Sequence, residues 1–239
     1  MVNLSRRSAR VDAFCPVALM LINFIAALTF YATLPMLLLG RSGGDEFALA
    51  VVQSTLWGAA VVGSLLVSLW GGLRRKIHGV LLGAGASFLL GDLLFGMGQT
   101  LPHWLVAAIF SALSVPLMDS SNMAILQAKV APAMQGRFFA LFHTARQLFV
   151  PVGYLLGGWL VDDWLSPALA PAGALAAPFG WLVGVGPGAG CGLLFVATAL
   201  LGSMVCFGGY LFPALRNLED DLADHDAEVT TVYDFGLCD

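Results

Sequence analysis

Six long apolar runs limit what this chain can fold into. They cover residues 13–39, 47–69, 80–97, 104–126, 138–161 and 191–211. An α-helix needs about 20 apolar residues to cross a bilayer, and each run is close to that length or longer. The runs are continuous and lack the alternation seen in the strands of membrane barrels. Hydrophobic residues make up 59% of the chain and charged residues 11%, which is outside the range of soluble domains. The sequence therefore predicts an all-α integral membrane protein, built as a six-transmembrane-helix bundle.

The positions of the basic residues predict the orientation of this bundle. If the six runs are spans, nine Lys and Arg residues lie in segments on one side of the membrane, and Arg41 lies alone on the other. Basic residues gather on the cytoplasmic side, so we expect a multi-pass protein of the inner or plasma membrane with both termini cytoplasmic. The expected organisation is a cytoplasmic N-terminal segment at 1–12, the transmembrane bundle at 13–213 and an acidic cytoplasmic tail at 214–239.

The tail accounts for the negative charge of the chain. It holds eight acidic residues after Arg216 and no Lys or Arg, whereas the net charge of the whole chain is −4. An acidic, weakly apolar end of this kind is typically solvated. Nucleic acid is therefore not expected as a partner.

The connection between the fifth and sixth runs is too long for a tight turn. Its apolar part, residues 173–183, is too short to cross a bilayer. Trp side chains favour the membrane–water interface, and Trp164 and Trp181 occur in this connection. We expect residues 173–183 to form an interfacial or a re-entrant segment on the outer face.

The residues that carry most enzyme chemistry are scattered. The four histidines, His78, His103, His143 and His225, form no metal-binding array, and the sequence contains no G-x-S-x-G motif. The four cysteines have no metal-ligand spacing. The sequence therefore predicts a protein that is not an enzyme and that holds no metal or cofactor.

Three charged residues lie inside the apolar runs and are the strongest candidates for a functional site. They are Asp92, Asp119 and Arg146. Charged side chains within a membrane usually face a cavity or a partner. At about 1.5 Å per residue, Asp119 and Arg146 lie at similar depth in the fourth and fifth runs, whereas Asp92 lies deeper and apart.

The neighbours of these residues leave two interpretations open. Asn122 lies one turn from Asp119, and His143 and Gln147 lie within a turn of Arg146. The cluster is either a structural ion pair between adjacent helices or part of a transport site. Asp92 has no obvious basic partner in the sequence, so we expect its carboxyl group to be protonated. It would then serve either as a proton carrier or as a neutral group in helix packing.

Three stretches resemble a known family. The first lies between the second and third runs and contains Gly71, Gly72, Arg74 and Arg75. The second is QAKVAPAMQGRFFA, which contains Gln135, Gly136 and Arg137. The third is PVGYLLGGWLVDD, which begins at Pro151. With these motifs the sequence resembles the C-terminal six-helix half of a major facilitator superfamily permease, of the macrolide-efflux type of drug:proton antiporter.

The resemblance implies secondary transport by half of a permease. In such transporters two helical bundles rock about a site near the midplane, and here a hydrophobic compound would move outward as protons enter. The implied partners are the lipid bilayer, a hydrophobic small molecule and a second six-helix half, supplied by another chain or by self-association. The motifs imply a gating role for the cytoplasmic residues Gly71, Gly72, Arg74, Arg75, Gln135, Gly136 and Arg137. The alternative is a truncated or regulatory membrane protein without transport activity.

Overall fold

The computed structural model describes residues 24–26, 29–30, 33–73, 75–130, 132–170 and 173–211. All regular structure in this part of the chain is helical. The elements are α2 (Thr33–Ser42), α3 (Glu46–Trp70), α4 (Lys76–Ala86), η1 (Ser87–Asp92), α5 (Leu93–Met97), α6 (Leu101–Lys129), α7 (Pro132–Trp159), η2 (Leu160–Leu165), α8 (Ser166–Ala168), α9 (Ala176–Val183) and α10 (Ala189–Leu211). The elements η1 and η2 are π-helical turns. The expected segments 1–12 and 214–239 lie outside the described residues.

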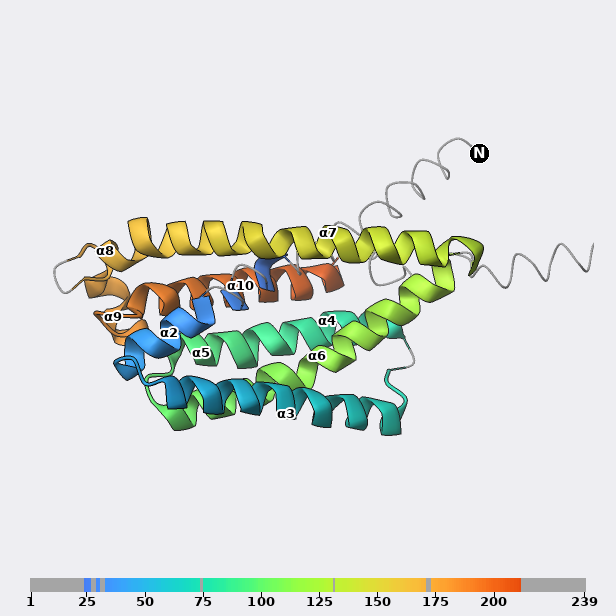
Figure 1. Ribbon diagram of the computed structural model, residues 1–239, viewed down its shortest axis with the longest axis horizontal. Helices are drawn as coiled ribbons and strands as arrows, with labels where there is room; N and C mark the ends of the chain where they lie inside the picture. The colour runs from blue at the N-terminus through green and yellow to red at the C-terminus, as the bar shows by residue number, and fades with distance from the viewer. Residues whose placement is uncertain are drawn as a thin grey trace, which may run out of the picture.

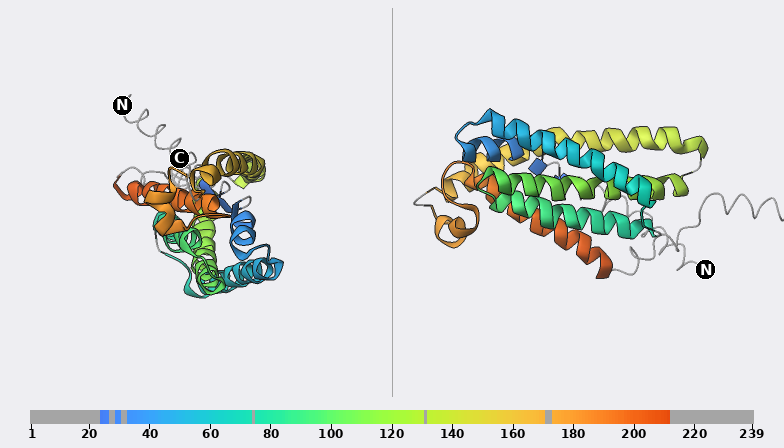
Figure 2. Two further views of the ribbon diagram at one scale, coloured as in Figure 1. Left: turned by 90° about the vertical axis from the view of Figure 1, so that its left-hand side faces the viewer. Right: turned by 90° about the horizontal axis from the view of Figure 1, so that it is seen from below.

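The long helices lie along one axis and reverse direction at its two ends (Figure 1). The connections from α3 to α4 and from α6 to α7 lie at one end, and those from α2 to α3 and from α5 to α6 lie at the other. Figure 2 shows α3, α4, α6 and α10 side by side, and α6 packs against both α3 and α4. This up-and-down order is what a chain that crosses a bilayer repeatedly requires.

Four helices of the described residues are long and apolar enough to cross a membrane. They are Glu46–Trp70, Lys76–Met97, Leu101–Gln127 and Ala189–Gly209, and they match the expected runs 47–69, 80–97, 104–126 and 191–211. The fifth run, 138–161, falls in α7 and η2, where Arg137, His143 and Arg146 lower the apolar content. The first run, 13–39, is only partly described. The structure is thus that of a helical membrane protein with four candidate spans.

Local signals explain where α3 begins and ends. The Asp45 carboxylate accepts hydrogen bonds from the backbone N–H groups of Phe47 at 2.9 Å and Ala48 at 3.2 Å, so it caps the first turn. Gly71 follows the last turn with φ 79°, a left-handed conformation that favours glycine, and its N–H donates to Val67 O at 2.9 Å. Gly72 also has a positive φ, of 73°. These two glycines therefore stop α3 and form its connection to α4.

Glycines also bring α6 close to its neighbours. A Cβ on Gly63 of α3 would lie 2.9 Å from Leu113 O, and a Cβ on Gly83 of α4 would lie 3.0 Å from Met118 N. Helices in membranes associate through such close backbone approaches, because lipid supplies no hydrophobic drive between them. The glycines thus position the α6 residues that face α3 and α4.

The apolar core lies toward the end of the bundle that holds α2 and α5. It is built from α2, α5, η2 and the first halves of α3, α6 and α10, with Leu37, Phe95 and Phe195 fully buried. The helix α9 lies at this same end (Figure 1). Its Val183 packs against Leu169 and Ala189, whereas Trp181 is 79% exposed. With eight residues, α9 is too short to cross a bilayer, and the choice between an interfacial and a re-entrant position remains a prediction.

Candidate functional site

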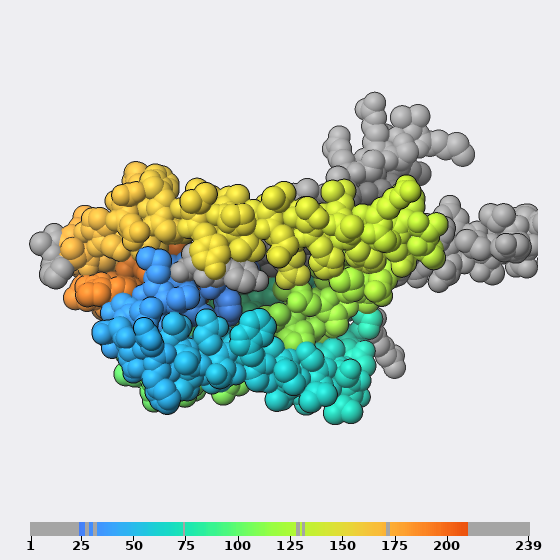
Figure 3. Space-filling model, viewed as in Figure 1, coloured from blue at the N-terminus to red at the C-terminus, as the bar shows by residue number. Residues whose placement is uncertain are grey.

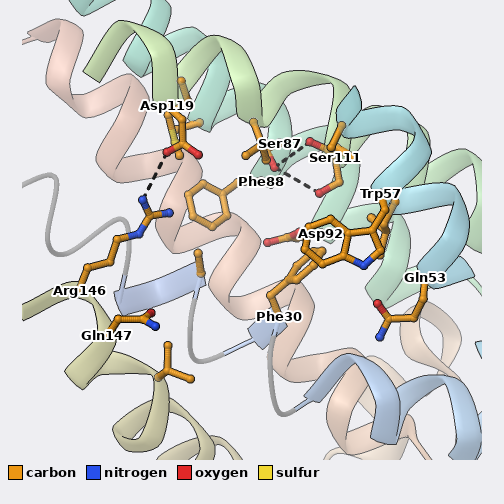
Figure 4. Close-up of a pocket in the computed structure, with 18 residues that line it drawn as sticks. Phe30, Gln53, Trp57, Ser87, Phe88, Asp92, Ser111, Asp119, Arg146 and Gln147 are labelled. Atoms are coloured by element: carbon orange, nitrogen blue, oxygen red, sulfur yellow. Dashed lines mark hydrogen bonds and ion pairs between the residues drawn. The ribbon is translucent and has the colours of Figure 1, made fainter. Parts of the chain in front are cut away.

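A cavity of about 320 Å³ lies inside the bundle. Residues of α3, α4, η1, α6 and α7 line it, together with Ala26 and Phe30. Its polar side chains are Gln53, Ser87, Asp92, Ser111, Asp119, Arg146 and Gln147, and its aromatic side chains are Phe30, Trp57 and Phe88 (Figure 4). Figure 3 shows the face on which α7 and α3 form two ridges, with residues of α2 and α6 between them. The cavity therefore combines a largely apolar wall with a few convergent polar groups, as small-molecule sites do.

Asp119 and Arg146 form an ion pair within this cavity. Arg146 Nη1 lies 3.6 Å from Asp119 Oδ1 (Figure 4), so the pair joins α6 to α7. The contact expected from their similar depth is therefore present. The Arg146 side chain is 36% exposed and the Asp119 side chain 43% exposed, which is more than two residues enclosed between helices would show. Exposure of this size weakens the attraction by screening.

Asp92 is the most buried charged residue of the described chain, at 4% exposure. Its carboxylate points into the same cavity (Figure 4). No residue in the described ranges makes a hydrogen bond or ion pair with it. The expectation that Asp92 stands apart from Asp119 and Arg146 is thus correct for direct contact but wrong for the site, because all three line one cavity.

The π-helical turn η1 carries Asp92 to this position. Ser87 is the first residue of η1, and its hydroxyl lies 3.3 Å from the Ser111 hydroxyl of α6. Gly91 lies directly against the same serine, since a Cβ on Gly91 would be 2.7 Å from Ser111 Cα. Single π-helical turns inside longer helices occur frequently at functional sites. The sequence holds no clear signal for this turn, because Ser87–Asp92 reads as part of a continuous apolar helix.

The three polar neighbours predicted around the pair have different positions. Gln147 lines the cavity. Asn122 is buried at 6% exposure, is not part of the lining, and its Oδ1 has no hydrogen-bond partner among the described residues. His143 is exposed, does not line the cavity, and packs edge-on against Phe142 with ring centroids 6.0 Å apart. The predicted polar cluster therefore reduces to Asp119, Arg146 and Gln147.

The predicted loop residues have local structural contacts. Gln135 Nε2 donates to Gln127 O at 3.1 Å and to Val130 O at 3.0 Å, so it ties the start of α7 to the end of α6. Gly136 and Arg137 are exposed on α7. Arg75 precedes α4 in an extended conformation, and Arg74 lies outside the described residues. A gating role for any of them remains a prediction.

Arg41 has a structural position that its sequence context did not indicate. Its guanidinium donates to the carbonyls of Gly96 at 3.0 Å, Val183 at 2.6 Å, Phe95 at 3.5 Å and, more closely, Gly98. Gly192 leaves the space for it, since a Cβ there would overlap the guanidinium. Arg41 thus joins α2 to the ends of α5 and α9.

Comparison with known proteins finds distant relatives over part of the chain. Macrolide efflux protein A of Streptococcus pyogenes is 26% identical over 136 residues, which are 55% of this chain and 33% of the relative. This relative is an efflux protein, so the similarity is to a transporter. Macrolide efflux protein A of Enterococcus faecalis is 26% identical over 127 residues, which are 51% of this chain and 38% of that relative. The matches thus span 33% to 38% of the length of these curated relatives. No protein-family model and no solved structure matches the chain.

The described residues also contain no group of three or more His, Cys, Asp or Glu side chains that could hold a metal ion. The cavity contains the buried carboxylate of Asp92, the ion pair of Asp119 and Arg146, and aromatic side chains. Such groups bind a small molecule or exchange a proton.

Proposed function

We propose that this chain is half of a secondary-active efflux permease that moves hydrophobic drug-like compounds by proton antiport. The observation that carries the proposal is the position of Asp92, a buried carboxylate without a described partner that points into a cavity with aromatic walls. The distant similarity to macrolide efflux proteins supports the same function. Ionisable groups held inside a membrane domain mark proton and substrate pathways.

Each part of the cavity has a role in this proposal. Asp92 takes up and releases the coupling proton. Phe30 and Trp57 contact the apolar surface of the substrate. Asp119 and Arg146 either hold α6 against α7 or exchange their contact for the substrate, the two roles left open by the sequence. The substrate is a hydrophobic drug-like molecule, and the distant similarity to macrolide efflux proteins makes a macrolide the first compound to test.

A second six-helix half completes the transporter in this proposal. Rocking transport requires two bundles that alternate around one site. The partial exposure of Asp119 and Arg146 supports a cavity that is open on one side. Another chain or a second copy of this one supplies the missing wall. The proposed bundle has six spans, both termini cytoplasmic, and lies in the inner or plasma membrane, as the basic residues indicate.

Reconstitution tests the proposal. The purified chain is placed in proteoliposomes at densities that permit self-association, a pH gradient is imposed, and uptake of a radiolabelled macrolide is measured. Asp92→Asn is expected to abolish gradient-driven uptake while the macrolide still binds. Asp163→Asn, which changes an exposed carboxylate outside the cavity, is the matched control.

Two results would contradict the proposal. Gradient-driven uptake that persists in Asp92→Asn would remove this residue as the proton site. Absence of macrolide binding and uptake by the unmodified chain, both alone and with any co-expressed six-helix half, would favour the regulatory or truncated protein.

A further inference from the structure

A second, smaller pocket lies near the start of α4 and outside the cavity described above. Its volume is about 160 Å³, and the side chains and backbone of α3, α6 and the connection between α3 and α4 form it. Its polar groups are Ser68, Lys76, Ser120 and Ser121, and none of the described residues that line it is acidic. The pocket is therefore a small, positively charged site with hydroxyl groups.

The ammonium group of Lys76 lies over the glycine connection. Its Nζ is 3.8 Å from the position that a Cβ on Gly72 would take. Because Gly71 and Gly72 carry no side chains, the space beside the ammonium stays open. Lys76 is also the first residue of α4. The residue before it, Arg75, provides no side-chain cap. The partial positive charge of the helix start therefore adds to the charge of the ammonium group.

Ser121 is the observation that marks this pocket as a site for a ligand. It is 3% exposed, it lines the pocket, and its hydroxyl has no hydrogen-bond partner within the described ranges. A Cβ on Gly79 would overlap the Ser121 hydroxyl, so the glycine makes room for it between α4 and α6. Ser68 on α3 is exposed and also makes no hydrogen bond to a described residue. Buried hydroxyl groups are normally paired, and an acceptor in the pocket would pair that of Ser121.

We propose that this pocket binds a phosphate group, and that an anionic phospholipid headgroup supplies it. One ammonium, the buried hydroxyl of Ser121, the exposed hydroxyl of Ser68 and a helix start suit the oxygens of a phosphate. The pocket lies near the ends of α3 and α4, two candidate membrane spans, where lipid headgroups lie. Basic pockets between membrane helices bind such headgroups. The site is independent of the proposed transport and of the cavity that holds Asp92.

Lipid-dependent thermal stability tests the site. The purified chain in neutral detergent is titrated with phosphatidylglycerol, phosphatidylcholine or inorganic phosphate, and the unfolding temperature is followed. We expect a saturable rise with phosphatidylglycerol and a negligible one with phosphatidylcholine. Lys76→Gln and Ser121→Ala should each weaken the apparent affinity about tenfold. Arg137→Gln, which changes an exposed cation outside the pocket, should leave it unchanged.

Each outcome decides for or against the site. A saturable rise with inorganic phosphate that is lost in Lys76→Gln would support the phosphate site and identify free phosphate as its source. Equal stabilisation by phosphatidylcholine, or an equal loss of affinity in Arg137→Gln, would show a general lipid or charge effect and overturn the proposal. Unchanged affinity in both Lys76→Gln and Ser121→Ala would overturn it as well.

Discussion

The guanidinium of Arg41 donates a 2.6 Å hydrogen bond to the carbonyl of Val183, a residue 142 positions further along the chain. This contact connects the end of α2 to the end of α9, and the same guanidinium reaches three carbonyls near the end of α5. The last carbonyls of a helix have no partner inside it. Arg41 therefore supplies donors to the carbonyls at two helix ends. Of these carbonyls, only that of Gly98 accepts from a second side chain among the described residues, Trp104 Nε1 at 3.0 Å.

Replacing Arg41 should destabilise this end of the bundle. Arg41→Ala leaves several part-buried carbonyls without a donor, so we expect a loss of about 2 kcal/mol or more in the free energy of unfolding. Arg41→Lys should lose less stability, because one ammonium group can replace some of the hydrogen bonds that the planar guanidinium donates, but not all of them. The unfolding temperature in detergent measures both, with Arg137→Ala as the exposed control. Equal effects of the Arg41 and Arg137 variants would contradict the assigned role.

The pair of Asp119 and Arg146 should show a small coupling energy. At 36% and 43% exposure the two charges are screened, so a double-mutant cycle with alanine at each position should give about 0.5 to 1 kcal/mol. The exchange of both residues, Asp119→Arg with Arg146→Asp, should recover much of what either single variant loses. Additive single effects and no recovery in the exchange would show that the residues act separately.

Gly91 should tolerate no side chain, whereas Gly58 should. A Cβ on Gly91 would lie 2.7 Å from Ser111 Cα, and one on Gly58 would meet nothing within 4 Å. Gly91→Ala should therefore cost about 1 to 3 kcal/mol of stability through overpacking, and it should lower macrolide binding by moving Asp92. Gly58→Ala should be neutral or stabilise the helix by up to about 1 kcal/mol. Thermal unfolding and binding of the two variants, compared side by side, check this difference.

Gln135 should matter for stability and Gly136 should not. Gln135→Ala removes the hydrogen bonds to the carbonyls of Gln127 and Val130, at a cost of about 1 kcal/mol. Gly136→Ala adds a methyl group where nothing lies within 4 Å, so stability should stay the same or rise. Loss of transport in both variants with unchanged unfolding temperatures would instead support the gating role implied by the motif.

The long helices could be predicted from the sequence because apolar runs of span length have few alternatives in lipid. The expected runs at 47–69 and 104–126 differ from α3 and α6 by only a few residues at each end. The contact between Asp119 and Arg146 followed from equal depth in two helices joined by a short connection. These predictions need only local composition and helical rise.

The rest depends on contacts between distant parts of the chain. From the sequence, Arg41 reads only as a loop cation, because nothing near it indicates the carbonyls of α5 and α9. The sequence separates Asp92 from the pair, since depth along a regular helix does not indicate which face the residue presents. Spacing alone groups His143 with Arg146, whereas the structure exposes it beside Phe142.

The turn at Ser87–Asp92 also changes how this span responds to insertions and deletions. A π-helical turn holds one residue more than the α-helical turn it replaces, so η1 is equivalent to a one-residue insertion within a span. Removing one residue here would restore a regular helix and leave α5 in nearly the same rotation relative to α4, because the wider turn already takes up the extra residue. Phe95 would then keep its contact with Phe195, whose ring centroid lies 6.1 Å away. In this span, a single-codon deletion would therefore narrow the turn that carries Asp92 without separating two packed aromatic rings.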